Sequence, residues 1–422
     1  MRPAPRHSIT TAHLPRERIS ALLSSIFFCA VSTFCSGQTH NIVCSDGYGK
    51  FGAKFASGVT ASVGAAKKSQ LARRVCEARL SWDREDLVVE PEASQVDIDV
   101  LGLDLGLGTP VVAFQMKKSN TDWRMAYQIY SLQKPPRLQR TIAGGDFFSA
   151  ADTDLDGRVE IWTGDAQAVD GFENLSLGEF DFAPTIVPRF EDRRLMDVSP
   201  EFRAHFDNQI ADVRAHLDSQ ELSDFKNSDG QLYAMSPLPA EQFHRLRIAK
   251  IKVLEIVWAY LYSGREQDAW HALAEMWPSA DLDRIRASVL NARAHGVSGQ
   301  IDGASPGTSR FHLKKFAYIY ETVGNAGGDS SDTSAVSLTA DTKPQPILLR
   351  RPPPPGIQDA VPKSEESVDL VIDAAGKVRS AKTVGADDQE LISAAEGWKF
   401  IPAFKDSRAV ASRLRLAVVP LR

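Results

Sequence analysis

The residues best suited to chemistry are acidic ones that alternate along a short stretch near the middle of the chain. The stretch reads Asp152-x-Asp154-x-Asp156-Gly157-x-x-Glu160. On a tight loop this spacing directs several oxygen atoms at one centre, and calcium takes six to eight hard oxygen ligands. The backbone carbonyl of Arg158 is a further expected ligand. The pattern therefore predicts a calcium site, with a solvated acidic turn as the alternative.

The sequence around this loop excludes an EF-hand, because the twelfth position is Thr163 and the following residues read as a strand. A second acidic group, Asp97, Asp99 and Asp104, has an irregular spacing. We expect that group to be an ordinary acidic turn without a metal.

No pattern typical of catalysis accompanies the acidic loop. The chain of 422 residues contains no Gly-x-Ser-x-Gly, His-Glu-x-x-His or Walker A sequence. We therefore expect no catalytic residues and a non-enzymatic protein, with an enzyme of unrecognised type as a minor alternative. The net charge of −5 and the absence of a long basic run give no indication of nucleic-acid binding.

The acidic loop must be positioned by β-structure. Residues 41–90 alternate in hydropathy, and residues 95–200 carry a weak internal repeat in which an acidic or glycine-rich loop precedes three short strands. This arrangement resembles β-propeller blades of the FG-GAP or VCBS type, and the resemblance implies calcium at the second loop. Because a closed propeller takes four to eight blades, two copies predict a partial or merged β-domain.

A helical region follows the β-rich one. Ser199-Pro200 is a typical helix start, and apolar residues then recur at spacings of three and four. Three further helices are expected at roughly 239–263, 264–278 and 281–295. Residues 250–280 resemble one tetratricopeptide hairpin.

The first residues read as a targeting segment. Several arginines precede the apolar stretch 19–34, and small residues follow at Cys35-Ser-Gly37. Residues 1–37 are thus either a cleaved signal peptide or an uncleaved anchor. Of the four cysteines, Cys44 and Cys76 remain after cleavage, and an even pair in an exported chain predicts a disulfide, with two buried free thiols as the alternative.

The C-terminal residues predict the order strand, strand, helix, strand. Their most specific positions are Gly376, Val378, Trp398, Phe400 and Pro402. With the turn at 406–410, these motifs resemble the C-terminal domain of the TonB energy-transducer family over residues 361–422. The resemblance implies that a partner's extended segment pairs with a strand edge. Our candidate for that edge is the final strand, with Leu414, Leu416 and Val418.

Together these features predict a multidomain α+β protein. The expected parts are residues 1–37 as signal or anchor, 38–198 as a β-rich, propeller-blade-like domain, 199–323 as a helical domain, 324–360 as a disordered Pro-rich linker, and 361–422 as a TonB-like domain. The resemblance implies an exported envelope protein, periplasmic or secreted, or anchored in the inner membrane if the first segment is uncleaved. Its partner would be an envelope protein such as an outer-membrane transporter, to which it would transduce energy. The alternative is a calcium-stabilised periplasmic scaffold without transduction.

Overall fold

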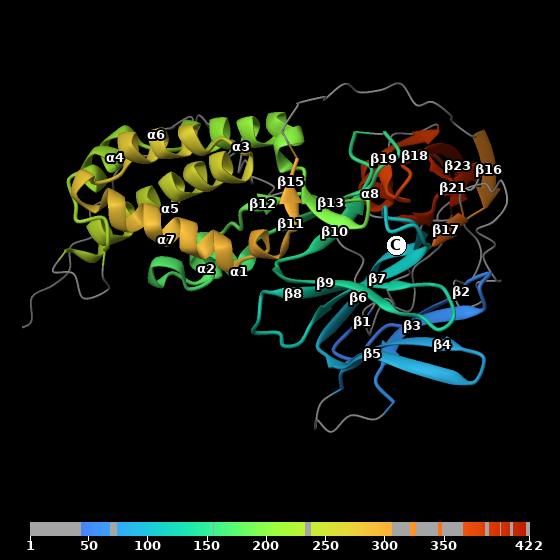
Figure 1. Cartoon of the computed structure of the whole chain (residues 1–422). Helices are drawn as coiled ribbons and strands as arrows, with labels where there is room; N and C mark the ends of the chain where they lie inside the picture. Colours follow the sequence, from blue (N-terminus) through green and yellow to red (C-terminus); the bar gives the residue numbers. More distant parts are fainter. Residues whose placement is uncertain are drawn as a thin grey trace, which may run out of the picture. The chain divides into compact units, whose positions relative to one another are not determined.

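The structure is a computed structural model that describes residues 44–67, 74–154, 156–232, 238–305, 321–325, 345–347, 366–384, 388–396, 398–405 and 408–418. All of them belong to one compact unit, Thr39–Arg422. They form a mixed α+β fold with eight α-helices and several antiparallel sheets, which confirms the α+β part of the prediction (Figure 1). The predicted signal or anchor segment lies outside the described residues. Within the described ranges, no helix combines the length and apolar character needed to cross a bilayer.

The N-terminal part consists of two successive antiparallel sheets. The first contains β2 (Phe51–Lys54), β3 (Val59–Ala65), β4 (Cys76–Trp82) and β5 (Glu85–Ala93) in sequence order. The second contains β1 (Cys44–Ser45), β6 (Gln95–Leu103), β7 (Val111–Lys117), β8 (Met125–Ser131) and β9 (Leu138–Gly145), in the order β1-β6-β7-β8-β9. Each sheet is mainly a meander of strands that pair with their neighbours in sequence.

Burial along these strands follows from their sequences. In β3, Val59, Ala61 and Val63 are buried and the residues between them are less so, as expected for a strand with one face on a core. In β7, adjacent residues are buried on opposite faces. Val112 belongs to a cluster shared with the first sheet, and Val111 belongs to a cluster shared with later elements. The second sheet is therefore an internal layer.

The third sheet carries the acidic loop. It contains β10 (Phe148–Ala151), β11 (Glu160–Gly164), β12 (Thr185–Ile186), β13 (Pro188–Glu191), β14 (Arg194–Asp197) and β15 (Gly303–Ala304). Between β11 and β12 lie the short helices α1 (Ala166–Val169), η1 (Phe172–Asn174) and α2 (Leu177–Phe180).

The helical region follows β14. It contains η2 (Ser199–Phe202), α3 (Arg203–Ala215), α4 (Ser219–Lys226), α5 (Ala240–Tyr262), α6 (Glu266–Met276), η3 (Ser279–Asp281), α7 (Leu282–His295) and η4 (Ser298–Gln300). The helices predicted at 239–263 and 281–295 match α5 and α7 to within one residue at each end. In Figure 1, α5 lies beside α3 and α6, in agreement with their contacts.

One hydrophobic cluster joins the third sheet to these helices. It includes Ile161 and Phe190 from the strands and Phe206, Leu254 and Trp258 from the helices. The strand β15, which follows the helices in sequence, also returns to pair with β14. The predicted boundary at residues 198 and 199 therefore separates two types of secondary structure but not two cores.

The C-terminal part contains the predicted strand–strand–helix–strand unit. Its elements are β18 (Glu366–Ile372), β19 (Val378–Val384), α8 (Gln389–Glu396), β20 (Lys399–Ile401), β21 (Ala403–Lys405), β22 (Arg408–Val410) and β23 (Ser412–Val418). A separate hydrophobic cluster holds it together and includes Val368, Leu370, Leu391 and Phe400.

Two strands lie within residues for which no strand was predicted. The strand β16 (Glu321–Asn325) pairs with β23, and β17 (Gln345–Ile347) pairs with β20. The main C-terminal sheet therefore has the order β16-β23-β18-β19. The end of β16 and all of β17 fall within the predicted linker 324–360, and the rest of that range lies outside the described residues.

Candidate metal loop and C-terminal strand edge

The acidic stretch forms the connection between β10 and β11. The two strands are antiparallel, with Ala151 opposite Glu160, so residues 152–159 make up the loop. Gly157 has a φ of 86°, in the left-handed region that favours glycine. Its amide donates a hydrogen bond of 3.2 Å to Oδ2 of Asp152, which closes the loop.

Three carboxylates meet in this loop. Asp152, Asp154 and Asp156 each offer an oxygen, and these oxygens lie within 4.8 Å of one another. Asp152 is only 1% exposed, and its Oδ1 has no hydrogen-bond partner. Because an unpartnered buried oxygen is unfavourable, this atom favours a bound cation. The donor set consists of hard oxygens, which is the set that fits calcium.

The pKa values of the three carboxylates are shifted in different directions. Burial raises the pKa of Asp152 to about 7, and burial together with Asp156 raises the pKa of Asp154. Burial acts on Asp156 as well, but hydrogen bonds from Arg158 lower its pKa below the usual range. The Arg158 amide donates to Oδ1 at 2.8 Å, and its Nε donates to Oδ2 at 2.6 Å. Arg158, predicted as a ligand through its carbonyl, thus neutralises one of the acids through its side chain.

Glu160, the remaining predicted ligand, lies in a different network. Its Oε1 pairs with the guanidinium of Arg189 at 3.2 Å, and its Oε2 accepts a hydrogen bond from the Thr153 amide at 2.9 Å. Both charged side chains are almost completely buried, and Arg189 also pairs with Glu191 and Glu201. Burial raises the pKa of Glu160 to about 8, against the opposing effect of Arg189. Three of the predicted side-chain ligands, all aspartates, therefore meet in the loop. The fourth, Glu160, forms an ion pair with Arg189 instead.

The earlier acidic group has protein partners instead. Asp99 accepts a hydrogen bond of 2.8 Å from the Tyr127 hydroxyl, and Asp97 accepts one of 3.1 Å from Gln115. Asp104 caps a turn by accepting the amides of Gly106, Leu107 and Gly108. Asp97 and Asp99 thus lie on β6 and not in the expected acidic turn, whereas Asp104 does lie in a turn.

One acidic residue near the loop was missed by sequence reasoning. Asp373 lies in the β18–β19 turn and is completely buried. Its Oδ1 accepts hydrogen bonds of 2.9 Å from the amides of Ala375 and Lys377, whereas its Oδ2 has no hydrogen-bond partner. Burial raises the pKa of Asp373 to about 6. In the sequence it reads only as a polar residue before a turn, and no local pattern links it to residues 152–156.

The predicted disulfide is present. Cys44 and Cys76 are bonded, with a Cα–Cα distance of 6.0 Å and a sequence separation of 32. Both residues are fully buried in the cluster between the first two sheets. The bond joins β1 to β4 and so links these two sheets covalently.

The C-terminal motif residues converge on the β18–β19 turn. Gly376 has a φ of 81°, and its carbonyl accepts a hydrogen bond of 2.8 Å from the Phe400 amide. A Cβ at this position would lie 1.9 Å from the Phe400 carbonyl oxygen, so only glycine fits. Phe400 is buried, whereas Trp398 and Val378 are partly buried around the same core. Pro402, next to this turn, is also buried.

The candidate partner-binding edge is paired within the chain. The strand β23 lies between β18 and β16, and β16 pairs with it in parallel from Glu321 opposite Arg413 to Asn325 opposite Ala417. Leu414 is buried in the C-terminal core, while the side chains of Leu416 and Val418 lie outside the described set. The strand β16 thus covers the candidate edge, and partner binding at these residues stays a prediction.

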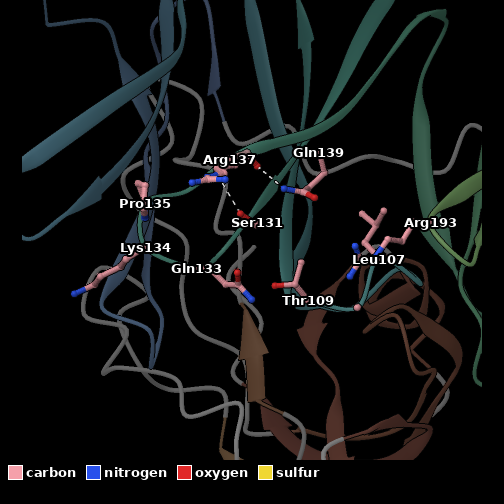
Figure 2. A pocket seen from close by; sticks show the side chains of 10 residues that line it. Leu107, Thr109, Ser131, Gln133, Lys134, Pro135, Arg137, Gln139 and Arg193 are labelled. Atoms are coloured by element: carbon pink, nitrogen blue, oxygen red, sulfur yellow. Dashed lines mark hydrogen bonds between the residues drawn. The ribbon is translucent and has the colours of Figure 1, made fainter.

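A pocket of about 390 Å³ lies near the end of the second sheet. Figure 2 shows its lining, which includes Ser131, Lys134, Arg137 and Arg193. The Ser131 hydroxyl accepts a hydrogen bond of 3.1 Å from the Arg137 amide. The ten lining residues include no carboxylate, histidine or cysteine, so the pocket offers positive charge but no acid–base pair for catalysis.

Comparison of the chain with family models, curated proteins and solved structures found no match.

Proposed function

We propose that this is an exported, non-enzymatic envelope protein whose C-terminal unit binds an extended segment of a partner protein by strand addition. The observation that carries the proposal is the pairing of β23 with β16. A segment distant in sequence adds to the edge of β23 in a parallel register of five residues. An edge that accepts a strand from its own chain has the backbone geometry to accept one from a partner.

The same pairing places a condition on partner binding. A partner strand must displace residues 321–325, because they already occupy the outer hydrogen bonds of β23. The apparent affinity is then the intrinsic affinity reduced by the fraction of molecules with a free edge. In this proposal β16 is an internal competitor that covers the edge until a partner arrives.

The resemblance to TonB C-terminal domains supplies the class of partner. It favours the short extended segment of an outer-membrane transporter, with energy transduction as the outcome. In the proposal the acidic loop binds calcium and stabilises the β-rich region. The second candidate is a calcium-stabilised scaffold without transduction, favoured by the orphaned oxygen of Asp152 in the acidic loop.

The proposal is tested by freeing the edge. Alternate amides of a strand face opposite neighbours, so replacing both Thr322 and Val323 by proline removes at least one hydrogen bond to β23. Binding of labelled N-terminal segments of outer-membrane transporters to the full chain would be measured by fluorescence anisotropy. We expect the double proline variant to bind about tenfold more tightly than wild type.

The matched control replaces Thr322 and Val323 by alanine, which keeps both amides and should leave the affinity near that of wild type. If the folded proline variant binds no segment, strand addition to β23 is wrong. If no segment binds while calcium still raises the melting temperature, the scaffold becomes the better description.

A further inference from the structure

The β18–β19 hairpin contacts one acidic residue of the second sheet and the backbone of the acidic loop. The Lys377 ammonium pairs with Oδ1 of Asp99 at 2.7 Å, and the Asp99 side chain is completely buried in this contact. The Arg379 guanidinium donates a hydrogen bond of 3.2 Å to the carbonyl of Thr153, which lies inside the acidic loop. The hairpin is therefore held against residues of the second and third sheets.

Two acids face each other where the hairpin meets the acidic loop. The hydrogen bond from Arg379 to Thr153 brings the hairpin that carries Asp373 to the loop that carries Asp152. In agreement with this, the negative charge of Asp373 raises the pKa of Asp152, second only to burial. Each has one oxygen engaged in its own loop, Oδ2 of Asp152 with the Gly157 amide and Oδ1 of Asp373 with two amides of its turn. The other oxygen of each, Oδ1 of Asp152 and Oδ2 of Asp373, is buried without a hydrogen-bond partner.

The hairpin brings a positive charge to Asp99 but a negative charge towards Asp152. At Asp99 the hairpin brings its own cation, Lys377. Near Asp152 it brings a further carboxylate, Asp373, whereas the hairpin's two cations, Lys377 and Arg379, bond to Asp99 and to the carbonyl of Thr153. Burying like charges beside one another is unfavourable unless a counter-ion or a proton compensates.

We infer that a divalent cation of the calcium class binds between the acidic loop and the C-terminal hairpin, with Asp373 as a ligand beside Asp152, Asp154 and Asp156. This inference rests on the calcium loop proposed above and adds to it a ligand from a different part of the chain. Four carboxylates supply hard oxygens and more negative charge than a single Ca²⁺ neutralises, which favours tight binding.

The consequence is that the cation fastens the strand-binding unit to the β-rich region. With calcium bound, the β18–β19 turn is held by the ion as well as by Lys377 and Arg379. Without it, the repulsion between Asp373 and Asp152 opposes the contact. Calcium thereby controls how firmly the C-terminal unit is docked.

The test uses calcium chloride and the full chain. Calcium affinity would be measured by isothermal titration for wild type, Asp373→Asn, Asp154→Asn and the control Asp369→Asn. Asparagine at 373 retains an oxygen for the turn amides but removes the charge. Asp369 lies on β18 and pairs with Arg415 at the surface, so its replacement changes the same net charge away from the site.

We expect Asp373→Asn to weaken calcium binding by about tenfold or more and Asp369→Asn to leave it unchanged. In wild type, hydrogen exchange of the amides of residues 373–384 should slow when calcium replaces chelator. This second measurement applies even if the Asp373 variant does not fold.

The two proposals fail in different ways. If wild type binds calcium and Asp154→Asn abolishes binding, but Asp373→Asn binds like wild type and the hairpin shows no calcium-dependent protection, only the inference about Asp373 is overturned. If wild type binds no calcium, the calcium loop itself is overturned.

Discussion

The two acidic groups of the β-rich region, around Asp99 and around Asp152, have opposite electrostatic surroundings. Asp99 has a tyrosine hydroxyl, a backbone amide and a lysine as partners, so its charge is matched within the protein. Asp152 is as deeply buried but keeps an oxygen without a partner and has other carboxylates around it. A group of acidic residues is therefore a candidate metal site only where no protein cation or hydrogen-bond donor compensates its negative charge.

The largest loss of folding stability is expected on replacing Asp99, whose charge is matched within the protein. Replacing Asp99 by alanine leaves Lys377 and the Tyr127 hydroxyl without their buried acceptor. Breaking one partner of such a network typically costs about 3–5 kcal/mol. Chemical denaturation should show this loss equally in calcium and in chelator. A loss that depends on calcium would mean that the first acidic group also contributes to ion binding.

The next effect is the stabilisation of wild type by calcium. An ion that binds only the folded state stabilises it by about 2.7 kcal/mol at one hundred times its dissociation constant. Differential scanning calorimetry should show a higher melting temperature in calcium than in chelator. Asp154→Ala should remove most of this shift, because Asp154 belongs to the three-carboxylate cluster. Identical melting of wild type in both buffers would make the loop an ordinary acidic turn.

The folding stability of the calcium-free protein should depend on pH, because burial raises the pKa values of Asp152 and Asp373. The folded pKa of Asp152 is raised by burial to about 7 and that of Asp373 to about 6, above the unfolded value of about 4. Between these values the folded state binds more protons than the unfolded state, so stability falls as pH rises from about 4 to about 7.

Between pH 5 and pH 7.5 we expect this loss to amount to about 2–3 kcal/mol for Asp152. Urea denaturation in chelator at pH 5 and pH 7.5 measures it, and Asp152→Asn is the comparison that isolates the contribution. A wild-type pH slope equal to that of the variant would show that Asp152 is not held in an uncompensated site.

The smallest effect is expected at Arg158. Its guanidinium contacts Asp156 and thereby competes with a cation for that carboxylate. Arg158→Ala should therefore tighten calcium binding by a few-fold, whereas Arg193→Ala, a substitution outside the loop, should not. Weaker calcium binding in Arg158→Ala would indicate that Arg158 supports the loop geometry instead of competing with the ion.

Local sequence patterns were sufficient for much of the secondary structure. The apolar spacing in residues 239–263 predicts α5 because a helix must place its apolar residues on one face. Gly376 marks the β18–β19 turn because a left-handed φ and the approach of Phe400 exclude other residues. Cys44 and Cys76 are bonded, as predicted from the even number of cysteines that follow the predicted signal segment.

Local patterns also misjudged how the parts are divided. The boundary after residue 198 coincides with a change from strands to helices, but burial of one continuous core crosses it. Trp398 and Phe400 belong to the same sequence motif, but Phe400 is buried in the C-terminal core whereas Trp398 is only partly buried. Residue type predicts a strand or helix, whereas core membership depends on which faces meet.

By itself, the sequence determined the acidic loop, the helices, the C-terminal strand–strand–helix–strand order and the cysteine pair, because each depends on residues close together or on composition. Three arrangements became visible only in the folded structure: Glu160 pairs with Arg189, β16 covers β23, and the hairpin that carries Asp373 contacts the acidic loop. These three arrangements join residues far apart in the chain. The physical reason is that charge pairing and strand pairing over such distances depend on the packing of whole layers, which no local spacing encodes.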